Sequence, residues 1–230
     1  MKDYTFSLRE GVFIIDLDKT KELLESALAY LKKEVEAGKI VLFVGTKRQA
    51  KDKVKAVAEH AGMPYIVHRW LGGTLTNYET VKKSITEMES LESQIISPLF
   101  NANTKKERKV MTDRLEKLRT VFGGVKDMKK LPDLLFVVDA HREKLAIDEA
   151  TRMGIPVIAM ADTDANPVNI NHIIPANDDA AKSIDLVMDE VNSVLGVKKA
   201  AVKTSIEPTK TEETAKSSEE TETKVKKEKK

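Results

Sequence analysis

Short apolar runs, separated by segments of helical length, constrain the fold of this chain more than any other feature. The runs are Val12–Leu17, Ile40–Val44, Tyr65–Val67, Leu134–Val138 and Pro156–Met160. Continuous apolar runs of this length are typical of strands buried on both faces, as in parallel sheets. We therefore expect these segments to be strands of one buried sheet.

The segments between the first runs carry apolar residues at helical spacing. These residues are Leu23, Leu24, Ala27, Leu28, Leu31 and Val35, followed by Val54, Val57, Ala58 and Ala61. Gly38, Gly62 and Gly154 each precede an apolar run, at the place where a glycine ends a helix. Alternating strands and helices predict an α/β fold: a three-layer Rossmann-like or flavodoxin-like domain with a mainly parallel sheet.

The alternation stops between residues 77 and 122, where two helical patterns flank the segment 97–103. Their apolar residues recur every three or four positions, namely Tyr78, Val81, Ile85, Met88, Leu91 and Ile95, then Met111, Leu115, Leu118 and Phe122. Two such stripes predict an inserted antiparallel coiled-coil helical hairpin. We expect a core domain formed by residues 1–76 and 123–197, a hairpin at 77–122, and a disordered charged tail at 198–230, which is nearly free of apolar residues.

Composition excludes several classes of protein. The chain contains no cysteine, which excludes disulfides, thiolate catalysis and cysteine-based zinc sites. Its histidines, His60, His68, His141 and His172, lack the spacing of metal ligands, so we expect neither a metal nor a cofactor. No apolar run reaches the roughly 18–20 residues that span a bilayer, and no signal peptide is evident, so we expect a cytoplasmic protein that does not bind membranes.

The net charge of +2 hides an uneven distribution. Residues 39–83 hold nine basic and three acidic side chains, a net of +6, and residues 104–130 hold ten and four, also +6. Residues 131–200 hold six basic and twelve acidic side chains, a net of −6. This pattern suits a protein that presents one positive face to phosphate groups, although ordinary charge scatter is the alternative.

The turn Gly45-Thr46-Lys47-Arg48 is the most enzyme-like feature, because it joins an apolar run to a helical segment. It lacks both the Walker A pattern and the G-x-G-x-x-G pattern. A helix N-terminus with a hydroxyl and cations, extended by Lys51, suits a phosphate of any origin, from RNA or from a nucleotide. Asp139, together with Asp162 and Asp164, follows later runs and would suit Mg²⁺ in an enzyme, although an aspartate there commonly caps the next helix.

A second motif, His68-Arg69-Trp70-Leu71-Gly72-Gly73-Thr74-Leu75-Thr76-Asn77, follows the third run. Arg69 is the preferred RNA contact, whereas Trp70 either stacks on a base or anchors the turn by packing. Gly73 permits close approach of a partner, and Thr74 and Asn77 offer polar groups to ribose and phosphate. This motif opens directly into the predicted hairpin.

These motifs resemble those of the bacterial small-subunit ribosomal protein S2 family. The resemblance rests on Phe43–Lys47, His68–Asn77, Leu131–Asp133 with Val138-Asp139, Gly124–Met128, Gly154–Val157, Asp162–Asp164 with Pro167, and Ile174–Ala180, and it covers about residues 11–195. One departure is a shortened N-terminus: relatives usually carry a Gly-x-His-x-Gly-His pattern and a Trp-Asn-Pro turn before the first run. Contacts made by that segment are therefore not carried over.

The resemblance implies a structural constituent of the 30S subunit that binds 16S ribosomal RNA, contacts other small-subunit proteins, and in many bacteria helps to recruit ribosomal protein S1. It implies no catalysis, and we expect no homo-oligomer. The alternative is an α/β enzyme, or a protein that binds a nucleotide or phosphosugar at Gly45-Thr46-Lys47. The candidate RNA-binding residues are Thr46, Lys47, Arg48, Lys51, His68, Arg69, Trp70, Gly73, Thr74, Asn77, Lys82, Lys105, Lys106, Arg108, Lys109 and Arg114.

Overall fold

The structure is a computed structural model that describes residues 1–98, 100 and 104–196. The chain divides into two units, Met1–Lys199 and Ala200–Lys230, and the described residues all belong to the first. The charged tail predicted at 198–230 lies outside the described residues. In the described part of the chain, no helix is both long and apolar enough to cross a membrane.

A five-stranded parallel sheet forms the centre of the first unit, in the order β4-β3-β5-β6-β7. The strands are β3 (Val41–Val44), β4 (Tyr65–Ile66), β5 (Leu134–Val138), β6 (Val157–Ala161) and β7 (His172–Pro175). Phe43 of β3 lies opposite both Tyr65 of β4 and Phe136 of β5, which fixes the register at the middle of the sheet. Four of the predicted apolar runs thus supply strands of one buried sheet.

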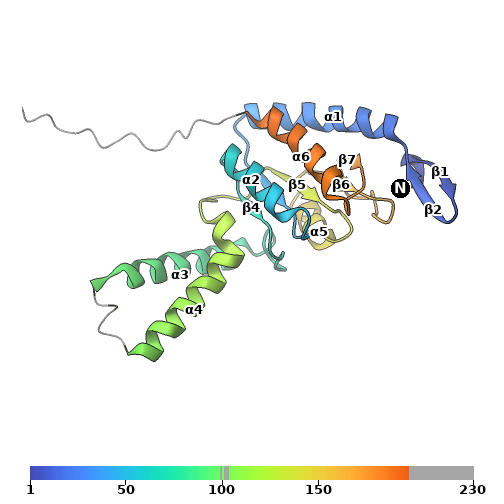
Figure 1. Ribbon diagram of the computed structural model, residues 1–230. Helices are drawn as coiled ribbons and strands as arrows, with labels where there is room; N and C mark the ends of the chain where they lie inside the picture. The colour runs from blue at the N-terminus through green and yellow to red at the C-terminus, as the bar shows by residue number, and fades with distance from the viewer. Residues whose placement is uncertain (99, 101–103, 197–230) are drawn as a thin grey trace, which may run out of the picture. The chain divides into compact units, whose positions relative to one another are not determined.

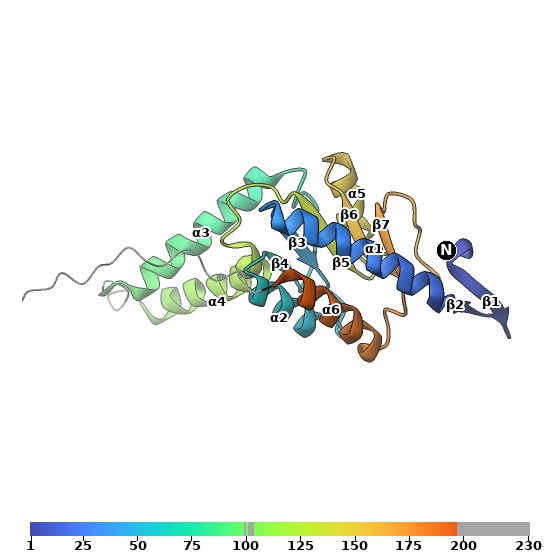
Figure 2. The ribbon, with the colours of Figure 1, turned by 90° about the horizontal axis from the view of Figure 1, so that it is seen from above.

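Helices cover both faces of the sheet, which confirms the three-layer prediction (Figures 1 and 2). Val41 and Phe43 face the layer of α1 (Leu17–Glu36), α2 (Lys51–Ala61) and α6 (Ala181–Leu195). Leu42 and Val44 face the opposite layer, where α5 (Lys144–Arg152) packs. Successive strand residues point to opposite faces, so both sets of side chains are buried.

Glycines at the ends of three helices take left-handed backbone conformations, as predicted for Gly38, Gly62 and Gly154. Their φ angles are +78°, +63° and +68°. Gly62 is the C-terminal cap of α2, and its N–H donates to the carbonyl oxygens of Ala58 and Glu59. A left-handed residue at this position ends the helix, so that the chain can continue into the following strand.

The apolar run at Val12–Leu17 is not part of the sheet, and the prediction for it was wrong. Its first part is β2 (Val12–Ile15), which pairs antiparallel with β1 (Thr5–Arg9) in a separate two-stranded sheet after the 3₁₀ turn η1 (Lys2–Tyr4). Glu10 and Gly11 both have positive φ, as a two-residue hairpin turn requires. Val12 remains 67% exposed, so apolar content alone did not indicate burial here.

The last strand of the sheet, β7, was not among the predicted runs. It is only four residues long, begins at His172 and ends at Pro175, which lacks a backbone N–H. These features suit an edge strand, since one side of an edge strand needs no ladder hydrogen bonds.

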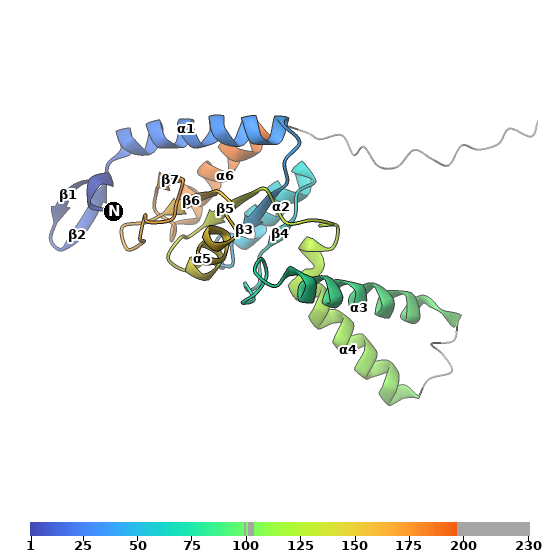
Figure 3. The same ribbon diagram turned by 180° about the vertical axis from the view of Figure 1, so that it is seen from behind.

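The predicted hairpin helices are α3 (Tyr78–Ile96) and α4 (Lys105–Phe122), and the 3₁₀ turn η3 (Gly123–Val125) follows (Figure 3). The seam is deepest near the sheet. There Val81, Ile85, Met88, Leu115, Leu118 and Phe122 are buried in the same core as the α5 face of the sheet. Leu91 and Ile95 are only partly buried, so the coiled-coil pattern holds mainly for the halves of the helices nearest the sheet.

Candidate nucleic-acid interface

The carboxyl ends of the five parallel strands meet at one edge of the sheet, where loops in α/β folds commonly form binding sites. The loops after β3 and β4 carry cations, among them Lys47, Arg48 and Arg69. The loops after β5, β6 and β7 carry aspartates. This edge therefore combines a basic half and an acidic half.

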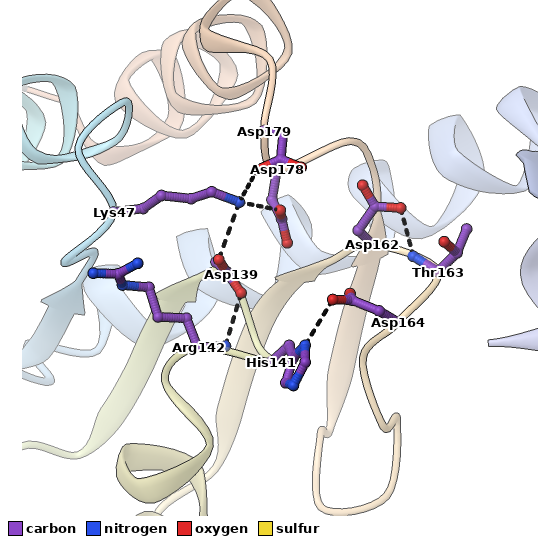
Figure 4. Close-up of a pocket in the computed structure, with 9 residues that line it drawn as sticks. All are labelled: Lys47, Asp139, His141, Arg142, Asp162, Thr163, Asp164, Asp178 and Asp179. Carbon is purple, nitrogen blue, oxygen red and sulfur yellow. Dashed lines mark hydrogen bonds and ion pairs between the residues drawn. The ribbon is translucent and has the colours of Figure 1, made fainter. Parts of the chain in front are cut away.

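Lys47 joins the two halves, because its ammonium reaches three aspartates (Figure 4). Its Nζ lies 3.1 Å from Asp139 Oδ2, 2.5 Å from Asp178 Oδ1 and 2.6 Å from Asp179 Oδ1. Only 12% of the Lys47 side chain is exposed, and 8% and 5% of the Asp139 and Asp178 side chains. The structure thus places Lys47, a predicted phosphate ligand, in a nearly buried ion-pair cluster.

Burial alone lowers the pKa of Lys47, but its hydrogen bonds to Asp178, Asp179 and Asp139 outweigh that effect and raise it. Burial raises the pKa of Asp178, an effect that Lys47 partly offsets. The cluster lines a cavity of about 510 Å³ together with His141, Arg142, Asp162, Thr163 and Asp164. Within the cavity, His141 Nδ1 lies 2.6 Å from Asp164 Oδ2, and that bond raises the pKa of His141.

Thr46 is buried, and both its polar groups bond to protein atoms. Its N–H donates to Glu143 Oε1 at 3.1 Å, and its hydroxyl also donates to that oxygen. Arg142 Nε donates to Thr46 Oγ1 at 3.0 Å. Burial raises the pKa of Glu143, against the lowering effect of the two bonds from Thr46. Hydrogen bonds to Arg142 and Glu143, which precede α5, therefore hold the turn after β3 in place.

The loop after β4 is held by a second buried carboxylate, Glu149 of α5. Glu149 Oε1 accepts from Trp70 Nε1 at 3.1 Å and from the Gly73 N–H at 2.8 Å. Its Oε2 accepts from the N–H groups of Leu75 at 2.9 Å and Thr76 at 3.2 Å. Trp70 is only 6% exposed and belongs to the hydrophobic core, the arrangement expected of the packing alternative for this side chain.

The remaining candidate residues fall into three groups. Arg48, His68, Arg69 and Asn77 are exposed on the loops at the sheet edge, whereas Gly73 and Lys51 are half-buried and Thr74 is buried. Lys82 is exposed on α3. On the first turns of α4, Lys105, Lys106 and Lys109 are exposed and Arg108 is half-buried, while Arg114 further along pairs with Glu87 of α3 at 2.9 Å.

Sequence reasoning did not single out Glu143, Glu149 or Asp178. Glu149 carried a recognisable signal, because it lies on the apolar face of α5 beside Ala146 and Ala150. A charged residue on a buried face must find partners, and here the partners are backbone N–H groups of a distant loop. Asp178 had no comparable signal, since its role depends on how β7 brings it to Lys47.

The carboxylates at the sheet edge do not form a metal site. Across residues 1–98, 100 and 104–196, no group of three or more His, Asp or Glu side chains is arranged to hold a metal ion. The Asp139 carboxylate instead contacts Lys47 and accepts from the Arg142 N–H at 2.8 Å. Asp139 thus binds the turn before α5, which agrees with the structural alternative for this residue.

Comparison with known proteins gives consistent matches over most of the chain. A family model described as Ribosomal protein S2 matches residues 1–196. The small ribosomal subunit protein uS2 of Francisella philomiragia subsp. philomiragia is 48% identical over 188 residues, 82% of this chain and 79% of that protein. The protein of the same name from Francisella tularensis subsp. novicida is 48% identical over the same shares of both chains.

Proposed function

Because the chain belongs to the ribosomal protein S2 family, we propose that it contacts 16S ribosomal RNA through the first turns of α4 and through the loops after β3 and β4. The chain is a structural constituent of the small ribosomal subunit and not an enzyme. It associates there with ribosomal RNA and with other ribosomal proteins.

The observation that carries this proposal is the contrast between paired arginines in the sheet-proximal half of α4 and unpaired lysines at its start; Lys117, which is exposed and pairs with no described residue, stands outside this contrast. Nearer the sheet, Arg114 pairs with Glu87, and Arg119 lies 2.8 Å from Glu92. These cations hold α4 against α3. By contrast, Lys105, Lys106 and Lys109 are exposed and form no ion pair with any residue that the structure describes.

The position of these three lysines is unfavourable for the isolated protein. They lie at the start of α4, where the helix dipole is positive and cations are destabilising. The capping box between Thr104 and Glu107 supports the helix end, but it supplies only one carboxylate beside several cations. A polyanion would offset this repulsion, so the arrangement favours binding to an RNA backbone.

The sheet-edge loops offer a second set of exposed polar groups. Arg48 and Arg69 are exposed cations, and Asn77 offers an exposed amide. None of these groups lines the cavity beside Lys47. We expect recognition to depend on the shape and the phosphates of folded RNA.

The test compares two matched triple variants in subunits reconstituted without the wild-type chain. Replacing Lys105, Lys106 and Lys109 with Gln removes the proposed contacts, whereas replacing Lys21, Lys32 and Lys33 of α1 with Gln removes the same charge elsewhere. We expect only the α4 variant to bind the subunit less tightly. The slope of the logarithm of its binding constant against the logarithm of the salt concentration should be smaller in magnitude by about 2–3, for three lost phosphate contacts. Equal binding by both variants would contradict the proposal.

The thermal stability of the free protein gives an independent control. The α4 variant should be at least as stable as the wild type, because it removes cations from a helix N-terminus. Weaker binding combined with undiminished stability would assign the effect to the RNA contact. Weaker binding accompanied by unfolding would not support the proposal.

Two finer points also belong to this proposal. The chain comprises a core domain at residues 1–76 and 123–197 and an inserted helical hairpin at 77–122. The chain also helps to retain ribosomal protein S1, as the resemblance to its family implies. Subunits reconstituted with and without the chain should then differ in the S1 that they retain after sedimentation, and equal retention would contradict the second point.

A further inference from the structure

We infer that Glu149 is a positioning residue for RNA binding, which holds the loop after β4 so that Arg69 and Asn77 face outward. This inference rests on the proposed function, because it assigns a role to a residue that cannot itself touch RNA. Glu149 is buried under the loop, at 3% exposure. Its effect on a partner must therefore pass through the loop.

The bonds to Glu149 come from one side of a single loop. Trp70, Gly73, Leu75 and Thr76 all donate to its two oxygens. A carboxylate offers about four acceptor positions and no donor when ionised. The loop therefore uses essentially all the hydrogen-bonding capacity of this side chain, and its inward N–H groups are satisfied without water.

The loop backbone is bent to suit this arrangement. Gly73 has φ +91°, a conformation that other residues rarely adopt, and its N–H points at Glu149 Oε1. The Asn77 N–H then donates to the Gly73 carbonyl at 2.8 Å, which starts α3 directly after the loop. Glu149 thereby sets both the shape of the loop and the first turn of the hairpin.

A buried carboxylate contributes little net stability to a fold, because it must first lose its hydration. Its desolvation costs several kcal/mol, and an apolar side chain at such a place is often as good for stability. No cation pairs with Glu149 among the residues that the structure describes. Burial raises its pKa, but the N–H donors more than compensate and keep it below the usual value, so the group is ionised at neutral pH.

What the carboxylate provides is one defined loop conformation. Glu149 occupies the inward face of the loop, while Arg69, Gly72 and Asn77 remain exposed to solvent. A mobile loop would lose conformational entropy when it bound a partner, and a pre-formed loop avoids that loss. Glu143, the residue directly before α5, accepts two bonds from Thr46 in the neighbouring loop, so α5 and its N-cap residue hold both loops at the basic half of the sheet edge.

The test replaces Glu149→Gln, which keeps the size of the side chain but turns two N–H donors toward the loop's own donors. Ile147→Val is the matched control, because Ile147 is buried on the same helix and the change weakens packing without removing a hydrogen bond to the loop. Trp70 is the only tryptophan in the chain and reports directly on the loop. We expect acrylamide quenching of Trp70 to rise several-fold in Glu149→Gln and to stay unchanged in Ile147→Val.

Amide hydrogen exchange at Gly73, Leu75 and Thr76 should accelerate at least about tenfold in Glu149→Gln, while exchange in β5 and β6 stays slow. Subunit binding of that variant should weaken about tenfold, and binding of Ile147→Val should match the wild type. If Glu149→Gln does not fold, Glu149→Asp keeps the charge but shortens its reach. Quenching and exchange should then increase, and subunit binding should weaken, by smaller amounts than in Glu149→Gln.

The outcomes separate this inference from the proposed function. A loosened loop with unchanged subunit binding would overturn the positioning role and leave the RNA-binding surface intact. An undisturbed loop in the folded variant would overturn the geometric argument itself. If subunit binding changes neither with salt concentration nor in the α4 triple variant, the proposed function is overturned, whatever the result for Glu149.

Discussion

Replacing Lys47→Met separates two roles that this residue could have at the sheet edge. The sequence predicted a phosphate ligand, whereas the structure surrounds its ammonium with Asp139, Asp178 and Asp179. As an RNA ligand alone, Lys47 would matter little for the free protein. As the counter-ion of buried carboxylates, it matters for folding before any RNA is present.

The magnitude follows from the burial of the partners. Asp179 is 77% exposed at its side chain, so its contact contributes little. Asp139 and Asp178 are nearly buried, and removing the Lys47 ammonium leaves these two like charges without the counter-ion that lies between them. Breaking a buried pair in this way costs about 3–5 kcal/mol, so we expect the free energy of unfolding to fall by that amount.

Urea unfolding followed by circular dichroism measures this change, with Arg48→Gln as the exposed control, expected within about 0.5 kcal/mol of the wild type. Burial already raises the pKa of Asp178, and without Lys47 that pKa rises further, so the folded variant gains protons before the unfolded chain does. The deficit in the free energy of unfolding of the variant should therefore shrink as the pH is lowered. Adding Asp178→Asn should recover part of the loss. A Lys47→Met variant within about 1 kcal/mol of the wild type at pH 7 would refute the reasoning.

Three further predictions concern stability. Glu149 has a lowered pKa, so its ionised form stabilises the fold above the ordinary pKa of 4.5, and that contribution is lost as the pH falls through the lowered pKa. In acid titrations, the free energy of unfolding of Glu149→Gln should therefore approach that of the wild type below about pH 4.5. Gly124→Ala should lower the free energy of unfolding by about 1–3 kcal/mol, because its Cβ would lie 2.3 Å from the Tyr65 carbonyl oxygen; an unchanged melting temperature would count against this contact. Leu118→Ala should cost about 2–5 kcal/mol in urea unfolding, and Val110→Ala on the same helix, 60% exposed, less than about 0.5 kcal/mol.

The sheet was predictable where local sequence and long-range packing agree. Leu134–Val138 is apolar at every position because helices cover both faces of β5, and that requirement is visible in the residues themselves. The run at Val12 has the same composition but faces solvent, because the turn at Glu10 and Gly11 pairs it with the preceding segment. Position in the fold, rather than composition, distinguishes the two.

The candidate site was predictable as a region but only partly as a set of roles. The motifs at Gly45 and His68 do lie on neighbouring loops, because β3 and β4 pair in parallel and both end at the same edge. The partners of these loops come from residues about 70 to 130 positions later in the chain, such as Glu149 and Asp178. Such partnerships arise from topology, which a pattern of spacings does not encode.

The hairpin leaves the sheet after β4 and returns before β5, and a hydrogen bond from the Tyr78 hydroxyl to the Met128 carbonyl closes its base. The hairpin is thus an insertion whose two ends lie side by side at the core. Its reach can be lengthened or shortened in whole helical turns without altering the register of any strand. During evolution, the length and surface of the hairpin could therefore change with the RNA that it contacts while the sheet stays the same. The outer half of the hairpin could be exchanged by design for the same reason.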